Sequence, residues 1–401
     1  MERRWGNRNL KITENLAVSQ QTISPVASVR GYRPELDAVR FLAFLFVFFA
    51  HEIPHDPSPT SFTNHLSPGG ARIVFGIANM CTMGLCLFFA LSAYLITNLL
   101  LKERDENMAV SVRKFYLRRI LRIWPLYIFG ILIGIAWAFA FLGGQHATGF
   151  AWYMLFAGNF YCASVGWFNN PMLPLWTISI EEQFYLIWPW AMRWFSRRDL
   201  VLCALVFILV ANIKLFNFGQ RHANTDYEVW CNAFVQFEMF AVGILLALAR
   251  SHRKPGNVVA GVMLAISGPV LWFVACYTFQ VKQAASMGLA ISGFAMIVGY
   301  ALIAVGCGAI LQGFCMIGSS HIPKWAANLG KISYGLYVYH FLAIRLSFIP
   351  LLLLHIPYNV ITSCALAFPL TILAAKLSYT HLESPFLRLK RRFEIVHSRP
   401  I

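Results

Sequence analysis

The stretch LDAVRFLAFLFVFFAHEIP at residues 36–54 decides the fold, because it places ionisable side chains in an apolar run long enough to cross a membrane. About 20 apolar residues in a helix span a hydrocarbon core that is ~30 Å thick. An ionisable side chain at that depth is costly unless it has a partner or faces water. Asp37, Arg40 and His51 are therefore candidate functional residues.

The rest of the chain continues this pattern. Its 401 residues are 58% hydrophobic and 12% charged, which is too apolar for a soluble globular domain. Runs of spanning length predict an all-α, polytopic membrane helix bundle of about ten transmembrane helices. The apolar segment 149–162 is too short to span and is expected to lie against the bundle. The predicted spans are residues 36–54, 72–101, 122–142, 176–195, 200–216, 230–249, 257–277, 285–316, 332–354 and 359–379.

Positive charge is distributed unevenly among the loops. The formal net charge is +16, yet the loops at 52–71, 143–175 and 351–358 contain neither Lys nor Arg. This is the positive-inside pattern, which predicts cytosolic termini and makes the basic balance a topology signal rather than a sign of nucleic-acid binding. The basic loops are residues 102–122, 193–198, 250–254 and 388–392.

The chain divides into three segments. Residues 1–30 are polar and lack the charged-then-apolar pattern of a signal peptide, so we expect a disordered cytosolic tail. Residues 31–387 form the predicted membrane domain, and residues 388–401 form a basic cytosolic tail. The nine cysteines are scattered along the spans without a C-x-x-C pair, which favours core packing for all of them.

The first span carries its polar side chains on one face. Arg40 and His51 are eleven positions apart, which gives them nearly the same azimuth and about 16 Å of separation along the axis. Asp37 lies one turn before Arg40 and can pair with it, although both residues can equally serve as headgroup anchors. His51 is the stronger functional candidate, because a membrane histidine needs a hydrogen-bond partner and titrates near neutral pH.

Residues 51–55 also match the zinc signature H-E-x-x-H. That signature requires both histidines on one intact helix, and Pro54 lies between them, where it ends or kinks a helix. No third ligand follows at a recognisable spacing. We therefore expect no metal site, and an intramembrane zinc protease is only a minor alternative.

The fourth span contains two adjacent carboxylates. Glu181 and Glu182 lie one turn inside its outer end, and Glu181 shares a helix face with Tyr185. The positive end of the helix dipole explains one acid well and two acids poorly. This segment is therefore a second candidate for chemistry.

Basic and aromatic residues make two further candidates. Arg119 and Arg122 are one turn apart and can fork onto phosphate oxygens, although a loop that only sets topology has the same sequence. In the ninth span, Tyr337 precedes His340 by one turn. A hydrogen-bonded core histidine and a functional histidine are equally compatible with that position.

Taken together and in order, six segments resemble motifs of the acyltransferase-3 family of polytopic membrane acyltransferases, which modify exported carbohydrates. The resemblance covers residues 33–386. Ala38 and Ala93 stand where the family has glycine, and the opening arginine is displaced by one residue, so Arg33 is not carried over. The similar segments are R-x-L-D-G-L-R with its helix ending in His at 33–51, F-x-x-S-G-[FY]-L-I at 89–96, R-R-x-x-R-I-x-P at 118–125, W-[ST]-L-S-[VI]-E-x-Q-F-Y at 176–185, I-S-Y-x-L-Y-x-x-H at 332–340 and E-x-P at 383–385.

The resemblance implies roles for these residues. It makes His51 the general base, Arg40 an essential arginine and Glu181, rather than Glu182, the family glutamate. A carboxylate on the far ring nitrogen of His51 would set its tautomer, and a fixed cation would stabilise an oxyanion. We therefore expect His51 and Glu181 to converge in one water-accessible chamber. Phosphates of cytosolic acyl-coenzyme A are assigned to Arg119, Arg122 and Arg118, and supporting roles to Asp37, Trp176, Tyr185, Tyr337, His340 and Glu383.

The expected function is sugar O-acylation in the bacterial cytoplasmic (inner) membrane. The resemblance implies acetyl-coenzyme A as donor substrate, no bound cofactor, and a hydroxyl of a cell-surface or lipid-linked sugar as acceptor. A proton-coupled transporter is the alternative, since spans with buried His, Arg and Glu also suit a proton relay. The aromatic outer loops 52–71 and 143–175 suit stacking on sugar rings but name no sugar.

Overall fold

The computed structural model describes residues 32–54, 62–250, 256–282 and 291–394. The described residues form helices, turns and irregular segments, with no strand among them. The described residues cover nearly the whole predicted membrane domain, residues 31–387. The predicted disordered tail at 1–30, the second histidine of the zinc signature (His55) and residues 395–401 of the basic tail lie outside the described residues.

Each of the ten predicted spans contains a long helix. The helices are α2 (Pro34–Glu52), α3 (Pro68–Thr82), α4 (Gly84–Asn107), α5 (Val112–Phe141), α8 (Trp176–Trp194), α9 (Arg197–Gln220), α10 (Ala233–Arg250), α11 (Val258–Thr278), α13 (Gly293–Ile317), α15 (Ser333–Leu353) and α16 (Val360–Ser378). The second predicted span differs from the prediction, because it is divided at Met83 into α3 and α4. Among the described residues, 7 helical segments are long and apolar enough to cross a membrane. The all-α class and membrane character are confirmed, while ten crossings and cytosolic termini stay predictions.

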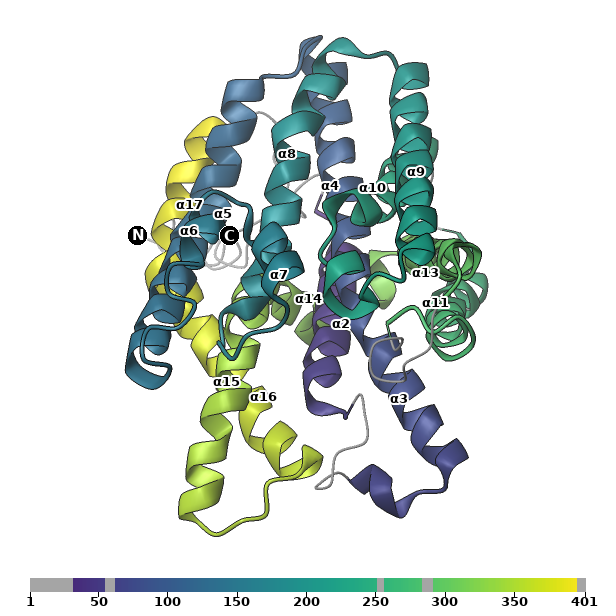
Figure 1. The fold of residues 1–401 in the computed structure, drawn as a ribbon. Helices are drawn as coiled ribbons and strands as arrows, with labels where there is room; N and C mark the ends of the chain where they lie inside the picture. Colours follow the sequence, from purple (N-terminus) through teal and green to yellow (C-terminus); the bar gives the residue numbers. More distant parts are fainter. Residues whose placement is uncertain (1–31, 55–61, 251–255, 283–290, 395–401) are drawn as a thin grey trace, which may run out of the picture. The chain divides into compact units, whose positions relative to one another are not determined.

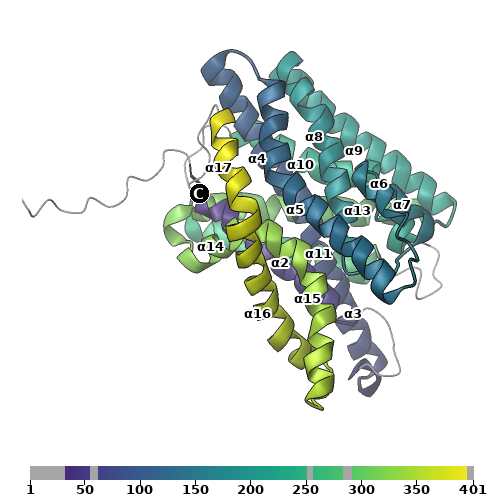
Figure 2. The same cartoon turned by 90° about the vertical axis from the view of Figure 1, so that its left-hand side faces the viewer.

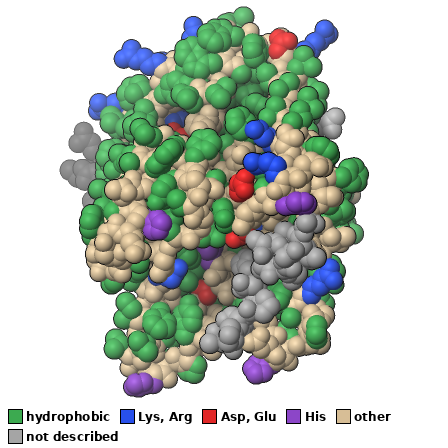
Figure 3. Space-filling view, viewed as in Figure 1, with side chains coloured by type: hydrophobic (Ala, Val, Ile, Leu, Met, Phe, Trp, Pro, Cys, Tyr) green, Lys and Arg blue, Asp and Glu red, His purple; other side chains and the backbone are tan. Residues whose placement is uncertain are grey.

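The helix connections sort to two ends. Figures 1 and 2 show the α4–α5 and α8–α9 connections at one end and the α15–α16 connection at the other. Figure 3, in the view of Figure 1, shows Lys and Arg side chains along the first of these ends. We call it the basic end, defined by residues 108–111 and 195–196, and call the other the far end, defined by residues 354–359. The arrangement agrees with the alternation of basic loops in the sequence.

Helix α2 is surrounded by other helices. It packs against α3, α4, α13, α15, α16 and the short helix α14 (Lys324–Lys331). The contact with α14 needs a glycine, because a Cβ at Gly330 would lie 1.9 Å from the carbonyl oxygen of Asp37. This close approach fixes the first two turns of α2, which carry Asp37 and Arg40.

The segment predicted to lie against the bundle does so as two short helices. Helix α6 (Phe150–Met154) packs against α5, and α7 (Gly158–Val165) packs against α8. The start of the basic tail is also structured, since α17 (Ser384–Lys390) and the turn η6 (Arg391–Phe393) pack along α5. Figures 1 and 2 both show α17 beside α5.

Candidate active site

A cavity of about 890 Å³ opens between α2, α3, α15 and the segment before α8. We call it the large cavity. His51 lines it together with aromatic and polar side chains from elements that are far apart in the sequence. Its other lining residues include Asn79, Thr82, Leu85, Trp167, Asn169, Trp176, Thr177, Asp226, Trp230, Lys282, Tyr337, Phe341 and Arg345.

His51 lies in the last turn of α2 and is oriented by that helix. Its Nδ1 lies 2.8 Å from the carbonyl oxygen of Val47, four residues back. Because a carbonyl oxygen only accepts hydrogen bonds, Nδ1 carries the proton and Nε2 is left with a lone pair. The predicted carboxylate partner at the far ring nitrogen is therefore wrong, since a backbone carbonyl of the same helix fixes the tautomer.

Two rings of α15 lie beside His51, those of Phe341 and His340, with centroids 4.9 and 5.0 Å from the His51 ring. The planes of the two histidine rings are inclined by 69°. His340 is fully buried; its Nδ1 lies 2.5 Å from the Tyr337 carbonyl oxygen, and its Nε2 has no hydrogen-bond partner among the described residues. His340 is therefore a core histidine of which only one ring nitrogen, Nδ1, is hydrogen-bonded among the described residues.

A second, small cavity of about 110 Å³ lies next to the first. The two cavities share Leu85, Thr177 and Tyr337 in their walls. The Tyr337 and Thr177 hydroxyls are 2.8 Å apart, and each also lies within hydrogen-bond distance of the Pro174 carbonyl oxygen. This hydroxyl pair marks the junction between the two cavities.

Glu181 lies in the small cavity, not in the large one. Its Oε2 accepts a hydrogen bond of 2.8 Å from the Tyr185 hydroxyl, which also contacts the Ser92 hydroxyl. The expectation of a single chamber for His51 and Glu181 is corrected accordingly, because the two residues line adjoining cavities. Helix α8 packs against α4 and α5, and residues of all three helices line the small cavity with Glu181.

Three arginines surround Glu181 in the small cavity. Arg40, Arg119 and Arg122 all line it and interact electrostatically with this carboxylate. The Arg119 guanidinium lies over the rings of Phe115 and Tyr185, at 5.4 and 5.6 Å from their centroids. Its Nε has no hydrogen-bond partner among the described residues, which leaves a donor for an anion.

Arg118 does not join this group, which corrects its assignment to the donor site. It is buried and pairs with Glu103 at 2.8 Å, and it donates to the Phe393 carbonyl oxygen at 3.1 Å. Both contacts tie α5 to its neighbours. Arg118 is therefore a structural residue, although its sequence position beside Arg119 suggested otherwise.

The remaining predicted residues take positions around these cavities. Asp37 and Arg40 form the predicted ion pair at 2.5 Å, and Trp176 lines the large cavity. Glu383 is buried near the basic end, where Arg122 is the cation that acts on it most strongly. Arg40 therefore lines a different cavity from His51. It lies with Arg119 and Arg122, which are predicted to bind the donor.

The zinc alternative gains no support from this arrangement. Helix α2 ends at Glu52, and Ile53 is extended, with φ −83° and ψ 132°. Among the described residues no group of three or more His, Cys, Asp or Glu side chains could hold a metal ion.

The described geometry can now be set beside known proteins. The acyltransferase domain model of the acyltransferase-3 family matches residues 33–379, which is most of the chain. The chain belongs to the acyltransferase-3 family. With its long apolar helices, this acyltransferase-3 protein is a multi-pass membrane protein. The family match stops before Glu383, so the supporting role of that residue stays a prediction.

Curated relatives are similar over most of this acyltransferase-3 chain. The peptidoglycan O-acetyltransferase OatA of Listeria monocytogenes is 26% identical over 379 residues, covering 89% of this chain and 56% of its own. The "Putative peptidoglycan O-acetyltransferase YrhL" of Bacillus subtilis is 28% identical over 392 residues, covering 88% and 55%. The "Putative O-acetyltransferase SAS0844" of Staphylococcus aureus is 24% identical over 383 residues, covering 88% and 57%. The chain thus spans about half the length of these relatives, and no solved structure matches it.

Several cavity residues of this acyltransferase-3 protein fall outside the motifs. They include Lys282, Asp226 and Arg345, which line the large cavity. Thr177 and Ser92 lie inside motifs and line the small cavity, but the sequence predicted no role for them. A sequence signal existed for Lys282, because a lysine on the predicted outer side departs from the positive-inside pattern. Asp226 had no such signal, since an acid in an outer loop is ordinary.

Proposed function

We propose that the chain is an integral-membrane O-acetyltransferase. It takes the acetyl group of acetyl-coenzyme A at the basic end and transfers it to a sugar hydroxyl in the large cavity. The observation that carries the proposal is the free Nε2 of His51 in a cavity that adjoins an arginine-lined one. Family membership and the names of the relatives support the reaction class.

The donor is assigned to the small cavity by its shape and charge. Coenzyme A carries phosphates, and Arg119 and Arg122 present guanidinium groups that suit phosphate oxygens. The volume of about 110 Å³ fits a narrow arm rather than a nucleotide. We therefore place the nucleotide outside this cavity at the basic end and the pantetheine arm within it, with the thioester at Thr177 and Tyr337.

The acceptor reacts at His51. Its hydroxyl donates a proton to Nε2 while its oxygen attacks the thioester carbonyl, and a tetrahedral oxyanion forms. Collapse of that intermediate breaks the carbon–sulfur bond, releases coenzyme A and returns the proton to the thiolate. General base catalysis of this kind contributes about 10²–10⁴ in rate. We assign stabilisation of the oxyanion to the Tyr337 and Thr177 hydroxyls, because both residues line the two cavities at their junction.

The reaction is tested on purified protein in lipid nanodiscs with radiolabelled acetyl-coenzyme A. The acceptor is envelope glycan from a strain that lacks this protein. Wild type should label the glycan, and His51→Ala should lose at least about 100-fold in rate. His321→Ala is a matched control, because its Nδ1 also contacts a carbonyl four residues back, Ile317, but it is exposed outside both cavities.

Two outcomes would reject the proposal. One is labelling by His51→Ala at the wild-type rate, which would remove the base. The other is movement of a solute across the bilayer by wild type, with neither hydrolysis nor transfer of the donor, which would make the protein a transporter. Mass spectrometry of envelope glycans with and without the protein then identifies the acceptor sugar by a mass difference of one acetyl group.

A further inference from the structure

The wall of the large cavity contains a lysine held by aromatic rings. The Nζ of Lys282 lies 5.0 Å from the ring centroid of Trp230 and 5.7 Å from that of Trp167. Its side chain is only 13% exposed. Cation–π contacts of this kind fix an ammonium group in place without using its hydrogen-bond donors.

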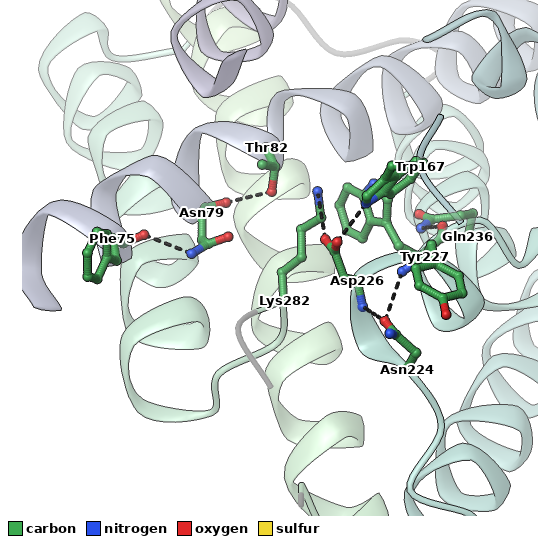
Figure 4. A network of polar contacts seen from close by, with 10 residues as sticks. Phe75, Asn79, Thr82, Trp167, Asn224, Asp226, Tyr227, Gln236 and Lys282 are labelled. Carbon is green, nitrogen blue, oxygen red and sulfur yellow. Dashed lines mark hydrogen bonds and ion pairs between the residues drawn. The ribbon is translucent and has the colours of Figure 1, made fainter. Parts of the chain in front are cut away.

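The carboxylate of Asp226, which lies beside this lysine, has another strong partner. Asp226 accepts a hydrogen bond of 2.6 Å from the Trp167 indole, while its other oxygen is 3.8 Å from the Lys282 nitrogen. A separation of 3.8 Å is an ion pair but too long for a hydrogen bond. Figure 4 shows this arrangement, with Asp226 between Lys282 and Trp167. Asp226 thus positions the lysine without satisfying its N–H groups.

Charges on the cavity wall favour an anion. Among the described residues that line the large cavity, two are cations, Lys282 and Arg345, and one is a carboxylate, Asp226. Both cations also act electrostatically on His51, so they lie on the side where the acceptor must bind. A neutral sugar would leave this excess positive charge partly desolvated and unpaired, which is unfavourable.

The remaining wall suits a sugar ring. Three tryptophans, Trp167, Trp176 and Trp230, line it together with the amide side chains Asn79 and Asn169. Asn79 donates to the Phe75 carbonyl oxygen at 2.9 Å, which fixes the orientation of its amide group (Figure 4). Aromatic faces with a few oriented polar groups form a typical pocket for a carbohydrate.

We propose that the acceptor is an acidic glycan, and that Lys282 binds its anionic group while the tryptophans hold the ring next to His51. This rests on the proposed function and adds the charge of the acceptor to it. Two sources of the anion share this chemistry: a carboxylate on the sugar and a diphosphate that links the sugar to a lipid.

The test measures binding to the full chain in nanodiscs with three matched probes. The first is a tetrasaccharide with one glucuronic acid, the second is the same tetrasaccharide with that carboxyl reduced to an alcohol, and the third is the reduced tetrasaccharide joined through diphosphate to a short polyprenol. The variants are Lys282→Gln, Lys282→Arg and Lys214→Gln. Lys214 is a control, since it also lies over an aromatic ring, Phe234, but outside the large cavity.

We expect an anionic probe to bind wild type at least about tenfold more tightly than the reduced probe, because hydrogen bonds to charged groups contribute about 1.5–3 kcal/mol. Lys282→Gln should abolish that difference, and Lys282→Arg and Lys214→Gln should retain it. Preference for the first probe assigns the anion to the sugar, and preference for the third assigns it to the lipid linkage.

Other outcomes overturn the proposal. Equal binding of charged and neutral probes, or equal weakening of both by Lys282→Gln, would make the lysine a structural residue. Binding of no probe would also reject it. Labelling of envelope glycan by the wild-type protein with radiolabelled acetyl-coenzyme A, measured on the same preparation, reports separately whether the proposed acetyl-transfer function holds.

Discussion

His51 owes its free nitrogen to a hydrogen bond within its own helix. An outward-pointing histidine at the end of a helix can reach the carbonyl four residues back, and Val47 supplies it. The sequence identified the histidine, but the expected hydrogen-bond partner of its ring was a carboxylate. That expectation failed because the position of Glu181 depends on how the helices pack, which the sequence does not show. The Asp37–Arg40 pair was predictable, since a spacing of three residues alone brings those groups together.

The neighbouring arginines Arg118 and Arg122 should behave differently when each is changed to Gln. Arg122→Gln should raise the KM for acetyl-coenzyme A by about ten- to hundredfold, since hydrogen bonds to charged groups contribute about 1.5–3 kcal/mol. Arg118→Gln leaves Glu103 buried without its partner, so it should destabilise the fold by about 3–5 kcal/mol. Steady-state kinetics and thermal unfolding in detergent measure both effects. A raised KM in the folded Arg118→Gln protein, with none in Arg122→Gln, would reverse the assignment.

Helix α2 connects the two cavities. Its first turns carry Arg40 into the small cavity, and its last turn carries His51 into the large one. The helical period predicted that both side chains share a face, and this is why the sequence identified both. It did not predict the break at Met83, because an apolar run of 72–101 has the same pattern whether it is one helix or two.

The position of α2 depends on one glycine in α14. Gly330→Ala should shift α2 or α14, since the added Cβ would overlap the Asp37 carbonyl oxygen. Overpacking of this kind costs about 1–3 kcal/mol, so the melting temperature should fall and acetyl transfer with it. Gly69→Ala is the matched control, because nothing lies within 4 Å of its Cβ position. Equal melting temperatures for the two variants would show that the close approach is absent.

Across the whole molecule, the two cavities differ in the cations that line them. Arg119 and Arg122 line the cavity toward the basic end, while Lys282 lies in the cavity with His51. The alternation of basic loops was readable from the sequence, because it depends on composition alone. The cavities were not, since each is assembled from segments that are more than a hundred residues apart in the chain.

Single cysteines at the two ends test the orientation. Met108 and Leu354 are 89% and 67% exposed and lie in the α4–α5 and α15–α16 connections. A membrane-impermeant maleimide applied outside intact cells should label Leu354→Cys and leave Met108→Cys unlabelled until the membrane is opened. The native cysteines in the described residues are buried or half-buried and give little background. The reverse labelling would place the basic end outside and exclude cytosolic acetyl-coenzyme A as donor.

The most direct test of the central claim is a cryo-electron microscopy structure with a thioether analogue of acetyl-coenzyme A. We predict phosphate groups within hydrogen-bond reach of Arg119 or Arg122, the pantetheine arm in the small cavity, and the acetyl carbon beside Tyr337 and facing His51. A nucleotide bound in the large cavity beside Lys282, or an acyl end that points away from His51, would contradict it.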